Sequence, residues 1–135
     1  MDDISGYLRE PTPMKNILLV EDDDCLRESL RDRLTISGYP VTCAANGTEA
    51  IKATDTQSFD LVATDIFMPQ KGGLAVIMHV RSHLMPCKVL AFSGGGNLLK
   101  ADDYLETAKE MRVDATLKKP FTCDEFLTAI REVLE

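Results

Sequence analysis

The chain has 135 residues, of which 44% are hydrophobic and 27% are charged, and its formal net charge is −7. This length suits one domain with its own core, and the acidic balance, with no basic stripe, argues against direct binding of nucleic acid. No apolar run is long enough to span a membrane, and the acidic start of the chain lacks the apolar stretch of a signal peptide. The four cysteines are scattered along the sequence. Together these features favour a location in the reducing cytoplasm.

Short apolar runs alternate with amphipathic segments along the chain. Residues 1–14 are polar and contain two prolines, and we expect a flexible arm there, followed by one domain over residues 15–135. The apolar runs predict strands at about residues 16–20, 41–44, 61–64, 88–92 and 115–117. The amphipathic segments predict helices at about residues 24–37, 48–56 and 74–84, within 100–111, and at 123–134. Five such units predict an α/β fold with a parallel sheet covered on both faces.

Three carboxylates directly follow two of the predicted strands. Glu21 and Asp22 come after the run 17–20, and Asp65 comes after the run 61–64. Ligands of open α/β sheets bind beyond the carboxyl ends of the strands, so we expect these carboxylates to share one crevice. Crowded carboxylates tolerate one another best around a cation, and a set of oxygen ligands suits Mg²⁺. The sequence therefore predicts a magnesium site.

Two further polar residues, Ser93 and Lys119, terminate the fourth and fifth predicted strands. Together with the carboxylates they favour phosphoryl transfer, which depends mainly on positioning and on charge neutralisation. Asp65, alone at the end of the central strand, is the best candidate nucleophile, because a carboxylate can form a covalent aspartyl phosphate. Lys119 and the cation would neutralise the phosphoryl oxygens, and Ser93 would donate a hydrogen bond to one of them.

Four segments together resemble the receiver domain of two-component response regulators over about residues 15–135. They are Ile17–Asp22, Asp65–Pro69 with Gly73, Phe92–Gly94 and Lys118–Phe121. The resemblance implies a flavodoxin-like, doubly wound sheet of five parallel strands in the order 2-1-3-4-5, with five helices in a three-layer sandwich. Because the last predicted helix ends at the end of the chain, we expect a stand-alone receiver.

The resemblance also implies a role for each site residue. Asp65 would accept the phosphoryl group in a reaction that needs Mg²⁺, with Mn²⁺ as a possible substitute. The metal ligands would be the carboxylates of Glu21, Asp22 and Asp65 and the backbone carbonyl of Phe67. The residues that bind the phosphoryl group and switch would be Ser93, Gly94 and Lys119. Thr116 occupies a switch position where the family often has an aromatic residue.

The implied function is phosphorelay signalling, with no turnover of an external substrate. The donor would be a phosphohistidine on a histidine kinase or a histidine phosphotransfer protein. The phosphorylated domain would bind a downstream protein through the face made by the fourth helix, the fifth strand and the fifth helix. We expect no direct contact with nucleic acid or with a membrane.

Two other functions stay open. An aspartate-nucleophile phosphatase carries a D-x-D-x-T motif after its first strand; Asp22 and Asp24 imitate the two acids, but Leu26 stands in place of the threonine. The other alternative is an inert pseudo-receiver that only binds a partner, and the complete set of acids, hydroxyl and lysine argues against it.

Overall fold

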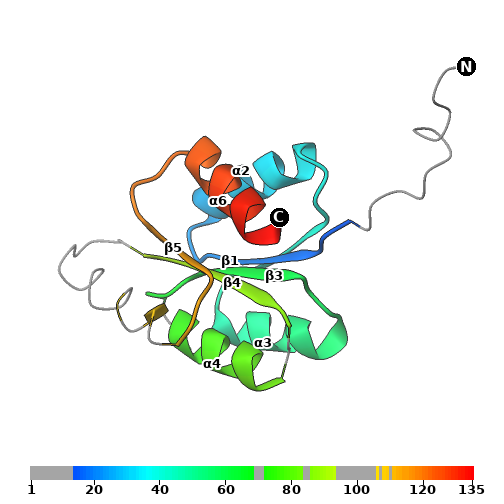
Figure 1. The fold of residues 1–135 in the computed structure, drawn as a ribbon, viewed down its shortest axis with the longest axis vertical. Coiled ribbons are helices and arrows are strands. Elements are labelled where there is room, and N and C mark those ends of the chain that lie inside the picture. The colour runs from blue at the N-terminus through cyan, green and yellow to red at the C-terminus, as the bar shows by residue number, and fades with distance from the viewer. Residues whose placement is uncertain (1–13, 69–71, 84–85, 94–105, 107, 110) are drawn as a thin grey trace, which may run out of the picture.

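The protein is described by a computed structural model over residues 14–68, 72–83, 86–93, 106, 108–109 and 111–135. Its strands are all parallel and form one sheet in the order β2-β1-β3-β4-β5. They are β1 (Ile17–Val20), β2 (Val41–Ala44), β3 (Leu61–Asp65), β4 (Lys88–Ser93) and β5 (Ala115–Lys118). One face carries α2 (Asp24–Ile36) and α6 (Cys123–Leu134), and the other carries α3 (Gly47–Thr56) and α4 (Gly73–His83) (Figure 1). The predicted doubly wound sheet, its order and its three layers are confirmed.

The central strands are continuous apolar runs because helices bury both of their faces. Every residue of β1 and β3 is buried. Alternate side chains of β1 enter opposite cores: Leu18 and Val20 pack in the cluster that includes residues of α3 and α4. Ile17 and Leu19 pack in the cluster that includes residues of α2 and α6. The strands are therefore packed on both faces, and because they run parallel, their carboxyl ends lie at one edge of the sheet.

The helices that flank the carboxyl edge begin at residues typical of helix starts. The side chain of Asp23 caps α2 by accepting a hydrogen bond from the backbone amide of Leu26 at 3.1 Å. Thr122 and Glu125 form a reciprocal capping box at the start of α6. Gly38, with a φ of 97°, follows the end of α2 in the left-handed conformation predicted there. The loops that lead into both helices are therefore held by specific bonds.

The structure differs from the sequence prediction at three strand ends and leaves one helix mostly untested. β3 extends to Asp65, which pairs with Phe92 and so belongs to the strand. β4 extends to Ser93 and β5 to Lys118, because these two residues still pair in the parallel register. Ser93 is thus the last residue of its strand and does not follow it. The predicted helix within residues 100–111 and the predicted arm of residues 1–14 lie almost entirely outside the described residues, although residues 106, 108 and 109 are helical. Four helices are therefore delineated in the described part of the chain, where five were predicted.

No helix among the described residues has the length and the apolar character needed to cross a membrane.

Candidate functional site

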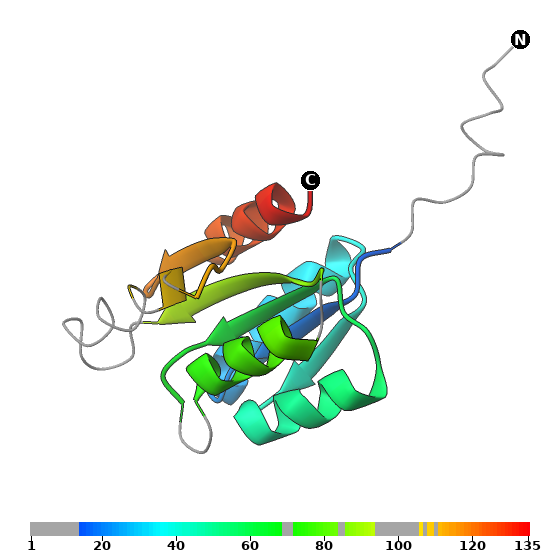
Figure 2. The same cartoon turned by 60° about the horizontal axis from the view of Figure 1, so that its bottom comes forward.

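The predicted site residues come together at the carboxyl edge of the sheet. Glu21 directly follows β1, Asp65 ends β3, Ser93 ends β4 and Lys119 directly follows β5. The strands are parallel and paired in register, so these positions fall along the same edge of the sheet. Figure 2 shows the sheet and its flanking helices from a second direction. The sheet topology alone therefore explains why residues far apart in the sequence meet here.

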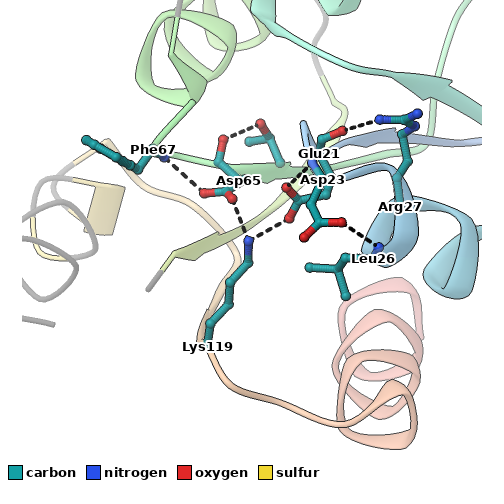
Figure 3. A network of polar contacts seen from close by, with 8 residues as sticks. Glu21, Asp23, Leu26, Arg27, Asp65, Phe67 and Lys119 are labelled. Carbon is teal, nitrogen blue, oxygen red and sulfur yellow. Dashed lines mark hydrogen bonds and ion pairs between the residues drawn. The ribbon is translucent and has the colours of Figure 1, made fainter. Parts of the chain in front are cut away.

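Lys119 lies between two buried carboxylates. Its ammonium nitrogen is 2.6 Å from Oε1 of Glu21 and 2.7 Å from Oδ2 of Asp65 (Figure 3). Glu21 is fully buried, Asp65 is 3% exposed, and the Lys119 side chain is 19% exposed. The same nitrogen lies 5.6 Å from the centre of the Phe92 ring, within range of a cation–π interaction. The ammonium thus offsets part of the repulsion between the two carboxylates.

A third carboxylate completes an acidic cluster. Glu21, Asp22 and Asp65 each offer an oxygen within 4.8 Å of the others, and this is the one such group of three found in the described part of the chain. With all groups ionised, three carboxylates and the Lys119 ammonium leave two net negative charges. Hard oxygen donors with that charge fit a small divalent cation such as Mg²⁺ or Mn²⁺.

Burial shifts the protonation of the cluster. It raises the pKa of Glu21 to about 7, with a smaller raising effect from the hydrogen bond with Asp22. Burial also raises the pKa of Asp65, against the lowering effect of the hydrogen bond from Lys119. Burial by itself would lower the pKa of Lys119, but its hydrogen bonds to Asp65 and Glu21 outweigh that effect and raise it. For both carboxylates, burial therefore disfavours the ionised form by more than the hydrogen bonds from the protein favour it.

The peptide after Asp65 helps to orient that carboxylate. The backbone amide of Phe67 donates to Oδ1 of Asp65 at 3.0 Å, and the Thr64 hydroxyl donates to the Asp65 carbonyl at 2.9 Å. The Phe67 side chain is 50% exposed and points away from the carboxylate (Figure 3). The Phe67 backbone therefore runs beside the acidic cluster, where its carbonyl stays a predicted metal ligand.

Ser93 presents a buried hydroxyl at the same edge. It is 1% exposed, and its Oγ makes no hydrogen bond with the residues that the structure describes. A buried polar atom without a partner is costly, and an oxygen atom of a bound ligand would satisfy it. Thr116 lies in β5 opposite Ala91 and is partly buried. Gly94, the other predicted phosphoryl-binding residue, lies outside the described residues.

Gly73, the first residue of α4, touches the backbone that carries Asp65. Its amide donates to the Ile66 carbonyl at 2.9 Å. A Cβ at this position would lie 2.1 Å from the Asp65 carbonyl oxygen and 2.6 Å from Cα of Ile66. Only glycine therefore allows α4 to approach the end of β3 this closely.

Replacing Gly73 with alanine should lower the free energy of unfolding by more than about 2 kcal/mol, because the new methyl group overlaps backbone that cannot rotate away. Urea unfolding followed by circular dichroism measures the loss. Gly72→Ala is the matched control: its nearest contact would be 3.1 Å, to the Ile66 carbonyl oxygen, and it should cost clearly less. Equal losses for the two variants would contradict the close approach.

Two contacts that hold the loop carrying Glu21 and Asp22 were not predicted from the sequence. The Asp23 amide donates to Oε2 of Glu21 at 3.0 Å, and Nη1 of Arg27 donates to the Glu21 carbonyl at 2.9 Å (Figure 3). The sequence feature that could have indicated the Arg27 contact is an arginine near the start of a helix. Helical side chains point towards the N-terminus of their helix, so such an arginine can reach the loop that precedes the helix.

Comparison with known sequences identifies the family to which this chain is similar. Residues 17–131 match the family model described as "Response regulator receiver domain". The "Probable transcriptional regulator ycf27" of Cyanidium caldarium is 33% identical over 122 residues, which cover 88% of this chain and 46% of that protein. The "Response regulator MprA" of Mycobacterium sp. (strain KMS) is 33% identical over 118 residues, which cover 87% of this chain and 50% of that protein. The chain thus spans about half the length of these relatives.

Solved structures agree as well. The response regulator TrrA from Thermotoga maritima, solved in complex with Mg(2+)-BeF, is 30% identical with a TM-score of 0.77, and the match covers 90% of this chain and all of that one. A CheY-like response regulator receiver domain protein from Methanospirillum hungatei JF-1 is 25% identical with a TM-score of 0.79, over 90% of this chain and 94% of that one. Since the family match covers most of the sequence and the fold agrees with it, the chain belongs to the response regulator receiver domain family.

Proposed function

We propose that this chain is a phosphorelay receiver in which Asp65 accepts a phosphoryl group from a phosphohistidine. The observation that carries the proposal is the position of the Asp65 carboxylate. It is almost fully buried, it lies 2.7 Å from the Lys119 ammonium, and it shares an acidic cluster with Glu21 and Asp22. A carboxylate between an ammonium and a cation site is suited to receive a phosphoryl group, because charge neutralisation dominates that chemistry.

In the proposed reaction an oxygen of Asp65 attacks the phosphorus atom, and the bond from phosphorus to the donor imidazole breaks, leaving its electron pair on the imidazole nitrogen. Mg²⁺ held by the carboxylates of Glu21, Asp22 and Asp65 and by the Phe67 carbonyl would supply positive charge to the phosphoryl oxygens. Lys119 would exchange a carboxylate contact for a phosphoryl oxygen, and the Ser93 hydroxyl would donate to another. The amide of Phe67 keeps the Asp65 carboxylate oriented.

The partners follow from the family and are part of the proposal. The donor would be a histidine kinase or a histidine phosphotransfer protein, in the cytoplasm. The downstream partner would be a protein that binds the predicted face of residues 100–111, most of which lie outside the described residues, together with β5 and α6. Direct binding of nucleic acid by this domain is not proposed.

The central test is incubation with acetyl phosphate and Mg²⁺ followed by intact mass measurement. The protein should gain the mass of one phosphoryl group with Mg²⁺ and none with excess EDTA. A pseudo-receiver would gain no mass under either condition, and that result would refute the proposal.

The phosphatase alternative has less support in the structure. The Asp24 carboxylate, which would be the second acid of a D-x-D motif, pairs with Arg27 at 2.6 Å and is 79% exposed. It therefore lies in a surface ion pair and not among the buried site residues. Sustained hydrolysis of p-nitrophenyl phosphate would nevertheless favour that alternative over the receiver function.

Mg²⁺ alone should raise the melting temperature of the protein by a few degrees at millimolar concentration, because a ligand that binds only the folded state stabilises it by mass action. Asp22→Ala should abolish this rise, since Asp22 is the exposed member of the acidic cluster. Asp32→Ala removes an exposed carboxylate of α2 and should leave the rise intact. An equal rise in Asp22→Ala would place the cation elsewhere.

Beryllofluoride, which mimics a phosphoryl group, should slow hydrogen exchange mainly within residues 93–120. The physical reason is that the mimic gives the buried Ser93 hydroxyl a partner that it lacks among the described residues. Ser93→Ala should still bind the mimic but show a smaller change in exchange. If the mimic is shown to bind the wild type but exchange does not change, the protein carries a phosphoryl group without switching its conformation.

A further inference from the structure

Arg27 reaches back from α2 to the loop that carries Glu21 and Asp22. Its Nη1 donates to the Glu21 carbonyl at 2.9 Å (Figure 3). Its Nη2 pairs with Oδ1 of Asp24 at 2.6 Å. The Arg27 side chain is only 18% exposed, so most of it is covered by the protein. Arg27 therefore makes a hydrogen bond to the loop backbone in addition to its surface ion pair with Asp24.

The position of this arginine goes against the usual preference of helices. The N-terminal turn of a helix carries a partial positive charge, which favours carboxylates such as Asp23 and Asp24 and disfavours a guanidinium. Fixing a long side chain also costs conformational entropy. A residue that breaks a local rule at a site edge points to a role in that site.

The carbonyl that Arg27 holds belongs to the peptide that joins Glu21 to Asp22. The orientation of that peptide sets the directions in which both side chains leave the backbone. Lys119 binds the Glu21 carboxylate through Oε1. Glu21 makes two other bonds: its amide donates to the Ala44 carbonyl at 3.1 Å, and its Oε2 accepts from the Asp23 amide at 3.0 Å. None of these bonds involves the carbonyl of Glu21, so Arg27 supplies a restraint that they do not.

We propose that Arg27 is a positioning residue for the divalent cation, one that fixes the Glu21–Asp22 peptide so that both carboxylates converge on Asp65. The inference rests on the proposed Mg²⁺ site. It predicts that loss of Arg27 weakens Mg²⁺ binding, because ligands that are no longer held in place bind a metal less tightly. A purely electrostatic effect has the opposite sign, since removing a positive charge beside a cation site should tighten binding.

The test compares Arg27→Met with the wild type by isothermal titration of Mg²⁺, with urea unfolding in EDTA as the measure of the fold. Methionine keeps an apolar stem and removes the donors. The dissociation constant should rise by about tenfold to a hundredfold, beyond any change that the unfolding curve in EDTA explains. Arg31→Met, one turn further along α2, removes a guanidinium that contacts Asp32 and should leave the dissociation constant unchanged.

Unchanged or tighter Mg²⁺ binding by a folded Arg27→Met variant would overturn the inference while the proposed function stands. If that variant does not fold, Arg27→Lys gives the answer. A lysine keeps the charge but lacks the fork that holds the Glu21 carbonyl and Asp24 together. It should bind Mg²⁺ several-fold more weakly, and wild-type affinity would overturn the inference. A wild type that binds no Mg²⁺ at all would overturn the proposed metal site as well.

Discussion

Replacing Asp65 with asparagine should abolish the gain of one phosphoryl group from acetyl phosphate and Mg²⁺. Asparagine keeps the shape of the side chain and can still accept the hydrogen bond from the Phe67 amide. It removes the carboxylate oxygen that would attack phosphorus, so no aspartyl phosphate can form. Because burial raises the pKa of Asp65, a neutral side chain should be tolerated there and the fold should be kept. Intact mass measurement after a fixed incubation gives the result directly.

Asp55→Asn is the matched control for this experiment. Asp55 is an exposed carboxylate on α3 near His79, and the same chemical change there should leave the mass gain of the wild type intact. A full mass gain in Asp65→Asn would show that another residue is the acceptor. Loss of the gain in both variants would point to an effect on the protein as a whole.

Replacing Glu21 with glutamine should stabilise the protein at pH 8 in the absence of divalent cations. Burial raises the pKa of Glu21 to about 7, so the fold favours the protonated, neutral side chain. For such a group the stabilising contribution is complete below the unfolded pKa of 4.5 and is lost as the pH rises through 7. The shift corresponds to at most about 3 kcal/mol. Glutamine, which never ionises, should avoid that loss.

Urea unfolding at pH 4.5 and at pH 8, in EDTA, measures the difference between wild type and Glu21→Gln. The advantage of the variant should be large at pH 8 and nearly absent at pH 4.5. Glu28→Gln, which changes an exposed glutamate of α2, should show no such pH-dependent difference. Millimolar Mg²⁺ should reduce the advantage at pH 8, because the cation offsets the charge of Glu21, which only the wild type carries. A Glu21→Gln variant less stable than the wild type at pH 8 would show that the ion pair with Lys119 outweighs the burial of the carboxylate.

The convergence of Glu21, Asp65, Ser93 and Lys119 could be predicted from the sequence because one rule governs it. Each residue stands at the carboxyl end of a short apolar run, and parallel pairing brings such ends to one edge. The strand positions were predictable for the same reason, since two-sided burial makes the runs apolar without interruption. The sequence could also indicate the acidic pair of the proposed metal site, because the repulsion between adjacent carboxylates at the end of a buried strand is relieved by a cation between them.

The contacts that depend on side-chain direction or on close approach of backbone could not be predicted in the same way. Arg27 carries no pattern that says which carbonyl it holds, and only the finished loop places the Glu21 carbonyl within its reach. Gly73 was visible as part of a motif, but its overlap with the Asp65 carbonyl appears only once α4 is packed. Likewise, the sequence placed Phe67 beside the site, and the structure turns its ring outward.

The wide separation of the site residues in the sequence has a consequence for the synthesis of the protein. Glu21 and Lys119 are 98 residues apart, and β5, at the edge of the sheet, is the strand that brings Lys119 to the acidic residues. A ribosome makes β1 and β3 long before Lys119 exists, so a growing chain has the acids without the ammonium that bridges them. The constellation can assemble only after translation has passed β5. Nascent chains stalled before that point would therefore lack Lys119 and, under the proposed function, would lack a complete phosphoacceptor site.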